Sequence, residues 1–149
     1  MSITLNEITK ENYLQSIKLK VNPEQEGFVA PNVYSIAQSK FYSSWKPTAI
    51  YSGSDMVGFL MYGEDDVNEG DGTIWIIRLM IDAKFQGKGF GKAAMIKLIE
   101  HIKTNYSQDE LFVSFVSDNS GAKNLYEALG FENTGRVELG ELVYKLKLK

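Results

Sequence analysis

The sequence predicts a single α/β domain in which helices flank a mixed central sheet. The length of 149 residues suits one ordinary domain, so residues 1–149 are expected to form one unit. The apolar residues switch repeatedly between a period of two and a helical period, which indicates interspersed strands and helices. A nearly continuous apolar run at 74–81 is typical of a strand covered on both faces. These observations give the order β-α-α-β-β-β-α-β-α-β-β.

The first half of the chain is predicted to contain three strands and two helices. Residues 3–8 alternate polar and apolar side chains, and Thr9 suits the N-cap of the helix that follows. Pro31 and Asn32 open a second helix, whose apolar residues fall on a single face. The remaining strands, at 48–51 and 56–62, are joined by a turn at 52–55.

The second half is predicted to alternate strands and helices before a closing hairpin. Apolar periodicity sets the helices, and a glycine after the last periodic residue marks a helix end. The expected elements are a strand at 74–81, a helix through Ile102, a strand at 111–116, a helix from Asn119 or Ser120 to Gly130, and a hairpin over 137–148 that breaks at 139–141.

Composition and charge exclude several classes of function. Lys and Arg number 16 against 19 Asp and Glu, a net charge of -3 that gives no basic face for a nucleic-acid partner. With no cysteine and one histidine, His101, the chain has no thiolate or multi-histidine metal site, and we expect no metal. No apolar run approaches the roughly 18 residues of a membrane helix, and the N-terminus lacks the apolar core of a signal peptide. A cytoplasmic protein without a membrane partner is expected.

Three glycines at alternate positions, Gly87, Gly89 and Gly91, follow the apolar strand and precede a helix. Glycine lets the backbone approach a ligand closely, and the first N–H groups of a helix have no intrahelical acceptor. The positive end of the helix dipole lies at the same place, so this turn suits an anion such as phosphate, with Lys88 and Lys92 adding charge. The spacing fits neither the Walker loop nor the Rossmann fingerprint. A tight turn without a ligand is the alternative.

Two motifs resemble the signatures of the GNAT superfamily of N-acetyltransferases. The segment from Gln86 to Gly91, QGKGFG, is similar to the Q/R-x-x-G-x-G/A pyrophosphate loop. The segment from Asn119 to Phe131 is similar to N-x-x-A-x-x-L-Y-x-x-x-G-F. The separation of the motifs and the strand order also agree, so the resemblance covers essentially the whole chain. It implies one N-acetyltransferase domain with acetyl-CoA as co-substrate, held where strands 74–81 and 111–116 splay apart.

The resemblance also assigns roles to individual residues. Tyr126 matches the tyrosine that protonates the leaving thiolate, and a backbone N–H at or near Met80 would polarise the thioester carbonyl. Relatives often place an acid at the position of Ile77, and isoleucine cannot serve as a base. The base is therefore left open among bulk water, Glu24, Glu26, Glu64 and Asp82. The residues expected to contact acetyl-CoA are Leu79, Met80, Ile81, Gln86, Gly87, Lys88, Gly89, Phe90, Gly91, Lys92 and Asn119.

The segment 24–38, EQEGFVAPNVYSIAQ, resembles that of bacterial spermine/spermidine N-acetyltransferases, which favours a polyamine acceptor. Two alternatives remain: another primary amine, such as a peptide N-terminus or lysine, and a catalytically idle acyl-CoA-binding module. Members of this kind are often dimers, so the resemblance suggests a homodimer. The candidate contacts for a cationic substrate are Glu24, Glu26 and Glu64. An acidic cluster would attract a polycation or simply form a solvated loop; it consists of Glu64, Asp65, Asp66, Glu69 and Asp71.

Overall fold

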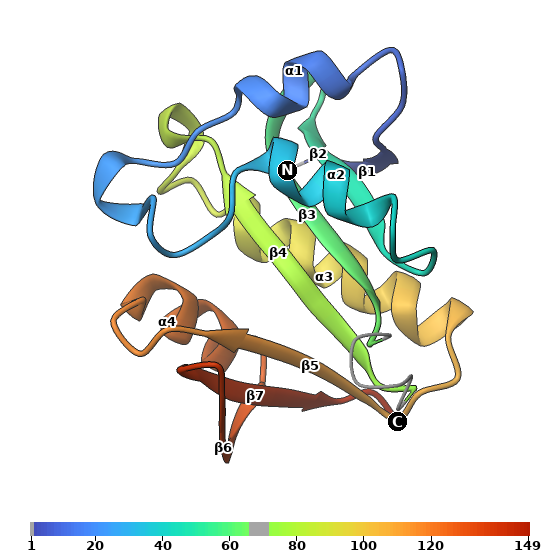
Figure 1. Ribbon diagram of the computed structural model, residues 1–149, viewed down its shortest axis with the longest axis vertical. Helices are drawn as coiled ribbons and strands as arrows, with labels where there is room; N and C mark the ends of the chain where they lie inside the picture. The colour runs from blue at the N-terminus through green and yellow to red at the C-terminus, as the bar shows by residue number, and fades with distance from the viewer. Residues whose placement is uncertain (1, 66–71) are drawn as a thin grey trace.

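The computed structural model describes residues 2–65 and 72–149 and contains one mixed sheet with helices on both faces (Figure 1). The predicted fold class and element order are confirmed. The strands are β1 (Ile3–Glu7), β2 (Lys46–Ser52), β3 (Asp55–Glu64), β4 (Ile74–Ile81), β5 (Glu110–Phe115), β6 (Glu132–Glu138) and β7 (Glu141–Lys147). The helices are α1 (Tyr13–Lys18), α2 (Asn32–Ser39), α3 (Phe90–Asn105) and α4 (Ser120–Ala128), with the short 3-10 helices η1 (Pro23–Gln25) and η2 (Ala83–Phe85).

The strands of the described residues form one sheet in the order β1-β2-β3-β4-β5-β7-β6. All neighbours are antiparallel except β4 and β5, which are parallel. This parallel pair is short and joins Ile74 to Leu111, Trp75 to Phe112 and Ile76 to Val113. Figure 1 shows β4 and β5 meeting near the C-terminus of the chain and separating toward their other ends. The predicted splayed strand pair is therefore confirmed.

The sheet separates two apolar cores. The larger core lies under α3 and α4 and includes Leu98 of α3 and Tyr126 of α4. The smaller core lies on the side of α2 and is built around Trp45, Phe59 and Met61. Figure 1 shows α3 crossing behind β3 and β4. Because successive side chains of a strand point to opposite faces, each position on β4, β5 and β7 belongs to one side or the other. These two sides are called here the α3/α4 face and the α2 face.

A β-bulge at Ile77 resets the direction of the side chains in β4. Ile76 and Arg78 pair with consecutive residues of β3, which leaves Ile77 without a direct partner. Ile76 faces the α3/α4 core, and the extra residue lets Leu79 face that core as well. Arg78 and Met80 consequently face α2. A bulge of this kind re-aims the side chains that follow it, and here it does so where β4 leaves β5.

The largest differences from the predicted boundaries are in two elements, since the other strands agree within two residues. The helix begins only at Tyr13, so Thr9 is not the residue next to it. Thr9 instead caps the turn that leads into the helix: its Oγ1 accepts from the Glu11 N–H at 3.3 Å, and its N–H donates to Oδ1 of Asn12 at 2.7 Å. The closing hairpin begins at Glu132 rather than 137. Its first strand is mostly exposed and bends at Gly135, where φ is +83°, so it lacks the alternation that marks a strand. The acidic positions Asp66, Glu69 and Asp71 lie outside the described residues.

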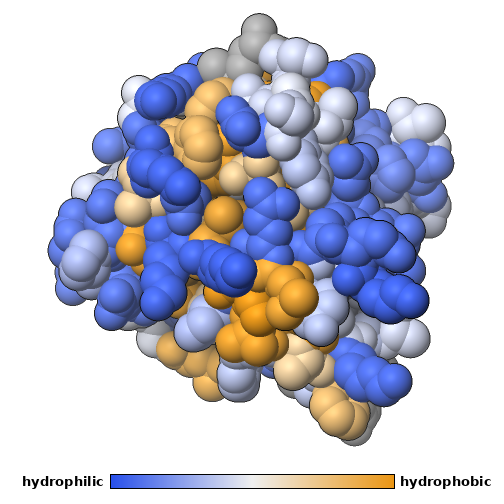
Figure 2. Space-filling view, turned by 90° about the horizontal axis from the view of Figure 1, so that it is seen from above, coloured by the Kyte–Doolittle hydropathy of each residue, from blue (hydrophilic) through white to orange (hydrophobic). Residues whose placement is uncertain are grey.

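A few apolar side chains on or next to α1 and α2 are exposed. Figure 2 shows apolar groups among hydrophilic ones on the face seen from above, where α1 is nearest to the viewer. The exposed fractions are 55% for Leu14, 56% for Val33 and 80% for Phe41. Apolar atoms contribute much of the surface of any folded domain, so these side chains do not by themselves indicate a partner. The homodimer stays a prediction.

The turn of the closing hairpin carries a leucine in the left-handed region. Leu139 has φ +52° and is fully exposed, and the following Gly140 has φ +78°. Two positive φ angles are typical of a type I′ turn, for which Asn-Gly is favoured. We expect Leu139→Asn to raise the free energy of unfolding by about 1 kcal/mol, because a branched side chain resists this conformation. Urea denaturation would measure it, with Leu139→Val as the control expected to lower stability. Reduced stability in Leu139→Asn would contradict the assignment of a type I′ turn at Leu139 and Gly140.

Candidate active site

A cleft of about 690 Å³ opens where β4 and β5 separate. Its walls come from the second half of β4, the glycine turn, the end of β5 and the start of α4. Residues of the segment 25–31, before α2, close it on one side, and Glu141 at the start of β7 closes it on another. A cleft at the carboxyl ends of diverging parallel strands is where α/β sheets usually bind ligands.

The glycine turn presents unpaired backbone N–H groups to this cleft. Gly87 and Gly89 have φ angles of +78° and +83°, which an L side chain rarely adopts, so glycine is required at both positions. The first hydrogen bond at the start of α3 runs from the Ala93 N–H to the Gly89 carbonyl, at 3.1 Å. The N–H groups from 90 to 92 therefore precede the helical ladder and find no acceptor in the described part of the chain. This arrangement fits a pyrophosphate.

The edge of β4 next to the cleft also lacks a strand partner. Pairing with β5 ends at Ile76, although β4 continues to Ile81. Leu79, Met80 and Ile81 line the cleft along this stretch, as does Phe90 at the start of α3. An extended chain that carries amide groups, such as the pantetheine arm of coenzyme A, can pair with a free strand edge. The residues present thus fit the co-substrate implied by the sequence motifs.

Gln86 ties the loop before α2 to the end of β4. Its Nε2 donates to Oε1 of Gln25 at 2.8 Å and to the carbonyl of Ile81 at 2.9 Å. Its Oε1 accepts from Nδ2 of Asn22 at 3.0 Å. Because both polar atoms of the side chain are engaged, Gln86 positions the wall of the cleft. Its predicted contact with the co-substrate stays a prediction.

The other predicted co-substrate residues occupy different places around the cleft. Gly91 and Asn119 line it, whereas Lys88 and Lys92 are exposed and do not. Oδ1 of Asn119 accepts from the Ala122 N–H at 3.0 Å and so caps α4. The two lysines lie on the glycine turn and the first turn of α3, where they add positive charge near the unpaired N–H groups.

Tyr126 reaches the cleft from α4 and is fixed by aromatic neighbours. Its ring stacks on Phe115 of β5 with centroids 5.8 Å apart and meets the edge of Phe131 at 5.3 Å. The residue is 4% exposed and lines the cleft, and its hydroxyl makes no hydrogen bond with any described residue. Burial raises the pKa of the Tyr126 phenol above its usual range. The hydroxyl is therefore protonated and free to donate.

Comparison with known proteins identifies the architecture around this cleft. Residues 11–131 match the acetyltransferase (GNAT) family. The chain belongs to the GNAT family. It is an acetyl-CoA-dependent N-acetyltransferase, as the two motifs predicted.

Several relatives of the GNAT domain cover most of its length. The spermine/spermidine N(1)-acetyltransferase of Bacillus subtilis is 32% identical over 147 residues, which is 96% of this chain and 97% of the relative. A Vibrio cholerae spermidine N-acetyltransferase in complex with CoA and spermine superposes with a TM-score of 0.74 at 15% identity, covering 96% of this chain and 92% of its own. An aminoglycoside acetyltransferase in complex with coenzyme A and kanamycin superposes with a TM-score of 0.80 at 19% identity. The superposition covers 98% of this chain and 95% of that one.

The structure brings only some of the predicted acidic residues to the GNAT cleft. Glu26 lines it, whereas Glu24 and Glu64 do not. Glu64 lies across from Ile74, at the far end of β4 from the cleft opening. Asp82 is buried, and its carboxylate accepts from the Lys20 N–H at 2.8 Å. Of the four acids considered as a base, Glu26 alone remains next to the cleft.

The cleft residues that were not anticipated from the sequence include Arg78, Ser114 and Glu141. Oγ of Ser114 donates to Oε1 of Glu141 at 2.8 Å. The Arg78 guanidinium donates to the Ile77 carbonyl at 2.9 Å and to Oε1 of Gln38 at 3.1 Å, while its buried Nε has no partner. Ser114 is a polar residue within an apolar stretch of β5, and this could have marked it in the sequence as a candidate site residue. No local signal marks Glu141, because only the β5–β7 pairing brings it to the site.

Two negative findings apply to residues 2–65 and 72–149. No group of three or more His, Cys, Asp or Glu side chains is arranged to hold a metal ion there. No helix in these ranges has the length and apolar character needed to cross a membrane.

Proposed function

We propose that the protein transfers the acetyl group of acetyl-CoA to a primary amine of a polyamine such as spermidine or spermine. The observation that carries the acceptor is the similarity to the Bacillus subtilis spermine/spermidine N(1)-acetyltransferase, at 32% identity over 96% of this chain. Glu26 at the cleft supplies a negative charge for an ammonium group of such a substrate. The net charge of -3 also favours the approach of a polycation.

In this proposal the unpaired N–H groups of the glycine turn hold the pyrophosphate, and the free edge of β4 pairs with the pantetheine arm. A backbone N–H at or near Met80 polarises the thioester carbonyl. These contacts position the donor, which converts a bimolecular reaction into one between aligned groups. Hydrogen-bond donors aimed at the developing oxyanion stabilise the transition state in the same cleft.

Tyr126 is proposed to protonate the leaving thiolate. A phenol, with an ordinary pKa of about 10, is a weaker acid than a thiol at about 8.5. Its contribution is therefore a hydrogen bond to the sulfur that becomes a proton transfer as negative charge develops. The raised pKa of the buried phenol keeps the proton on Tyr126 until that moment.

A second acceptor class is favoured by Arg78. Its guanidinium lines the cleft, where its positive charge can attract a carboxylate on the acceptor. Human N-acetylaspartate synthetase is 38% identical over 69 residues, 46% of this chain and 22% of that protein. An acceptor that carries both an amine and a carboxylate, such as an amino acid or a peptide, is therefore the alternative to a polyamine.

Thiol release from acetyl-CoA, followed with a thiol-reactive dye, separates these possibilities. The protein has no cysteine, so released CoA is the only thiol. We expect release to depend on spermine or spermidine and to be slower with amino acids and peptides. Release with the carboxylate-bearing amines alone would favour the second acceptor class. CoA binding without turnover of any amine would indicate an idle binding module and overturn the proposal.

A further inference from the structure

We propose that Glu141 is the carboxylate that receives the ammonium group of the acceptor and accepts its proton. The inference rests on the proposed function only in requiring a primary amine as acceptor. Glu141 would serve as the general base, a role that Ile77 cannot take because it lines the cleft with an apolar side chain.

The first support is that Glu141 is held at the cleft by the sheet itself. In the β5–β7 pair, Phe115 is opposite Leu142, which places Glu141 one residue beyond the end of the pairing. The Ser114 hydroxyl donates to Oε1 of Glu141 at 2.8 Å. Oε2 makes no hydrogen bond or ion pair with the described residues, so one carboxylate oxygen remains available. A general base needs such a fixed side chain with a free acceptor atom.

The second support is that Glu141 and Tyr126 reach the cleft from opposite faces of the sheet. Phe115 belongs to the core under α3 and α4, and Tyr126 stacks on it from that face. Ser114 points the other way, toward the α2 face, and Glu141 is bonded to it there. The proton donor for the sulfur and the proton acceptor for the amine are thus on opposite sides of the splayed strands. An amine that attacks from the α2 face would leave the thiolate next to Tyr126.

The third support is the comparison with Glu26, the other described acid at the cleft. Glu26 is exposed on the segment that follows η1, and no hydrogen bond to a described residue holds its side chain. A surface carboxylate that no hydrogen bond fixes can attract a cation but does not align a proton transfer. Glu26 therefore suits a distal ammonium group of a polyamine, and Glu141 suits the amine that reacts.

Arg78, on β4, does not occupy Glu141. Burial lowers the pKa of the Arg78 guanidinium, and the charges of Tyr34 and Glu141 act in the opposite direction. Arg78 and Glu141 form no ion pair within 4.0 Å. A substrate group can therefore approach Glu141 without breaking an existing ion pair.

The reaction balances with these two residues. The acceptor ammonium gives one proton to the Glu141 carboxylate, and the neutral amine forms a C–N bond to the acetyl carbon. The C–S bond breaks, and the thiolate takes the proton of the Tyr126 hydroxyl. The second proton of the attacking nitrogen returns to Tyr126, directly or through water, and Glu141 releases its proton to solvent. The net reaction converts an ammonium and a thioester to an amide, a thiol and one proton.

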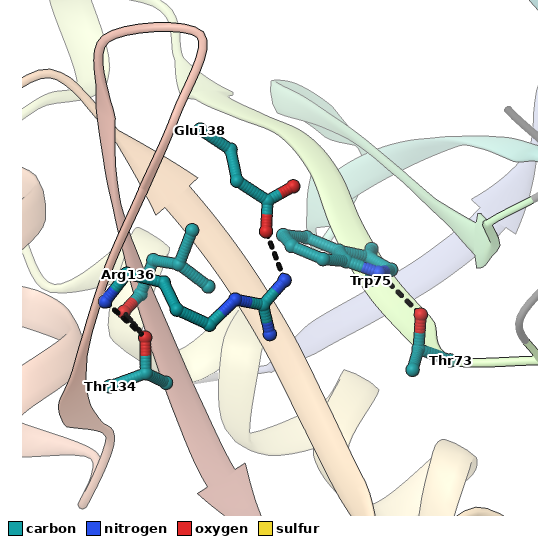
Figure 3. Close-up of polar contacts among 6 residues, drawn as sticks. Thr73, Trp75, Thr134, Arg136 and Glu138 are labelled. Atoms are coloured by element: carbon teal, nitrogen blue, oxygen red, sulfur yellow. Dashed lines mark hydrogen bonds and ion pairs between the residues drawn. The ribbon is translucent and has the colours of Figure 1, made fainter. Parts of the chain in front are cut away.

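The test compares Glu141→Gln with a matched change on the same hairpin, Glu138→Gln. Glu138 is opposite Glu141 in the β6–β7 pair, but its carboxylate bonds Arg136 on the surface (Figure 3). Glu138 does not line the cleft. We expect Glu141→Gln to lower kcat/KM for spermine by about 10-fold or more, within the range of a lost general base. The Kd for CoA and the melting temperature should stay unchanged. Glu138→Gln should match the wild type in turnover.

Three further variants make the outcome decisive. Ser114→Ala should give a smaller loss, because it releases Glu141 without removing its charge, and Glu141→Asp should restore part of the activity. A kcat/KM for Glu141→Gln within twofold of the wild type would overturn the assignment, and a large loss in Glu26→Gln alone would transfer the role to Glu26. If the wild type turns over only a different amine, the same comparison applies with that amine. Absence of turnover with every amine would overturn the proposed function and this inference together.

Discussion

Replacing Tyr126 by phenylalanine is expected to lower kcat by a factor of about 10² to 10⁴, the usual contribution of a positioned proton donor. The substitution removes one hydroxyl and keeps the ring that stacks on Phe115 and meets Phe131. The hydroxyl makes no hydrogen bond to a described residue, so its loss leaves no protein group unpaired. The Kd for CoA should therefore stay close to that of the wild type. Steady-state turnover and isothermal titration with CoA measure the two quantities.

A matched control for this variant is Tyr144→Phe. Tyr144 is also a buried tyrosine, but its hydroxyl donates to Oε2 of Glu127 at 2.9 Å and lies away from the cleft. Losing that hydrogen bond should cost about 1 kcal/mol of stability and leave kcat unchanged. Equal turnover in Tyr126→Phe and the wild type would show that another group, or water, protonates the thiolate.

The pH dependence of the wild type provides a separate test of Tyr126. A raised pKa favours the protonated phenol, so the proton donor persists to a higher pH than for an exposed tyrosine. We expect turnover to rise with pH as the acceptor amine loses its proton, and not to fall through ionisation of Tyr126 below about pH 10. A decline that begins near pH 8 in the wild type and is absent in Tyr126→Phe would contradict a raised pKa.

The donor side of the site was predictable because its parts are local in the sequence. Gly87, Gly89 and the start of α3 are adjacent along the chain, and positive φ angles with unpaired N–H groups follow from that order of residue types. Tyr126 was located through a motif on one helix. The two apolar segments flanking a helix have the pattern of a parallel pair, and their splaying was implied by the resemblance to the GNAT superfamily.

The acceptor side was not predictable because distant segments build it. Glu141 meets Ser114 across 27 residues of sequence, and only the insertion of β7 between β5 and β6 brings them together. The bulge at Ile77 decides that Arg78 faces α2, and a bulge leaves no mark in an apolar run. The prediction that Glu64 contacts the substrate also depended on strand pairing. Glu64 ends β3, which pairs with β4, but it lies at the far end of β4 from the cleft.

Replacing Gly58 by alanine is expected to lower both stability and affinity for CoA. Gly58 is in the middle of the sheet, where an added Cβ would lie 2.5 Å from the Met80 carbonyl oxygen and 2.8 Å from Cδ1 of Ile81. Real Cβ atoms do not approach backbone this closely, so β3 and β4 must move apart. We expect a loss of about 1–3 kcal/mol in the free energy of unfolding, as for other overpacked sites. Urea denaturation would measure it.

The same displacement reaches the active site, because Met80 and Ile81 form the wall of the cleft next to the glycine turn. The Kd for CoA should therefore rise in Gly58→Ala, even though Gly58 itself does not line the cleft. Gly27→Ala is the control for stability, since a Cβ there meets nothing within 4 Å. If Gly58→Ala were as stable as the wild type and bound CoA equally well, β4 would not be fixed by its contact with β3. Its position would then depend on Gln86, which bonds the Ile81 carbonyl from the other side.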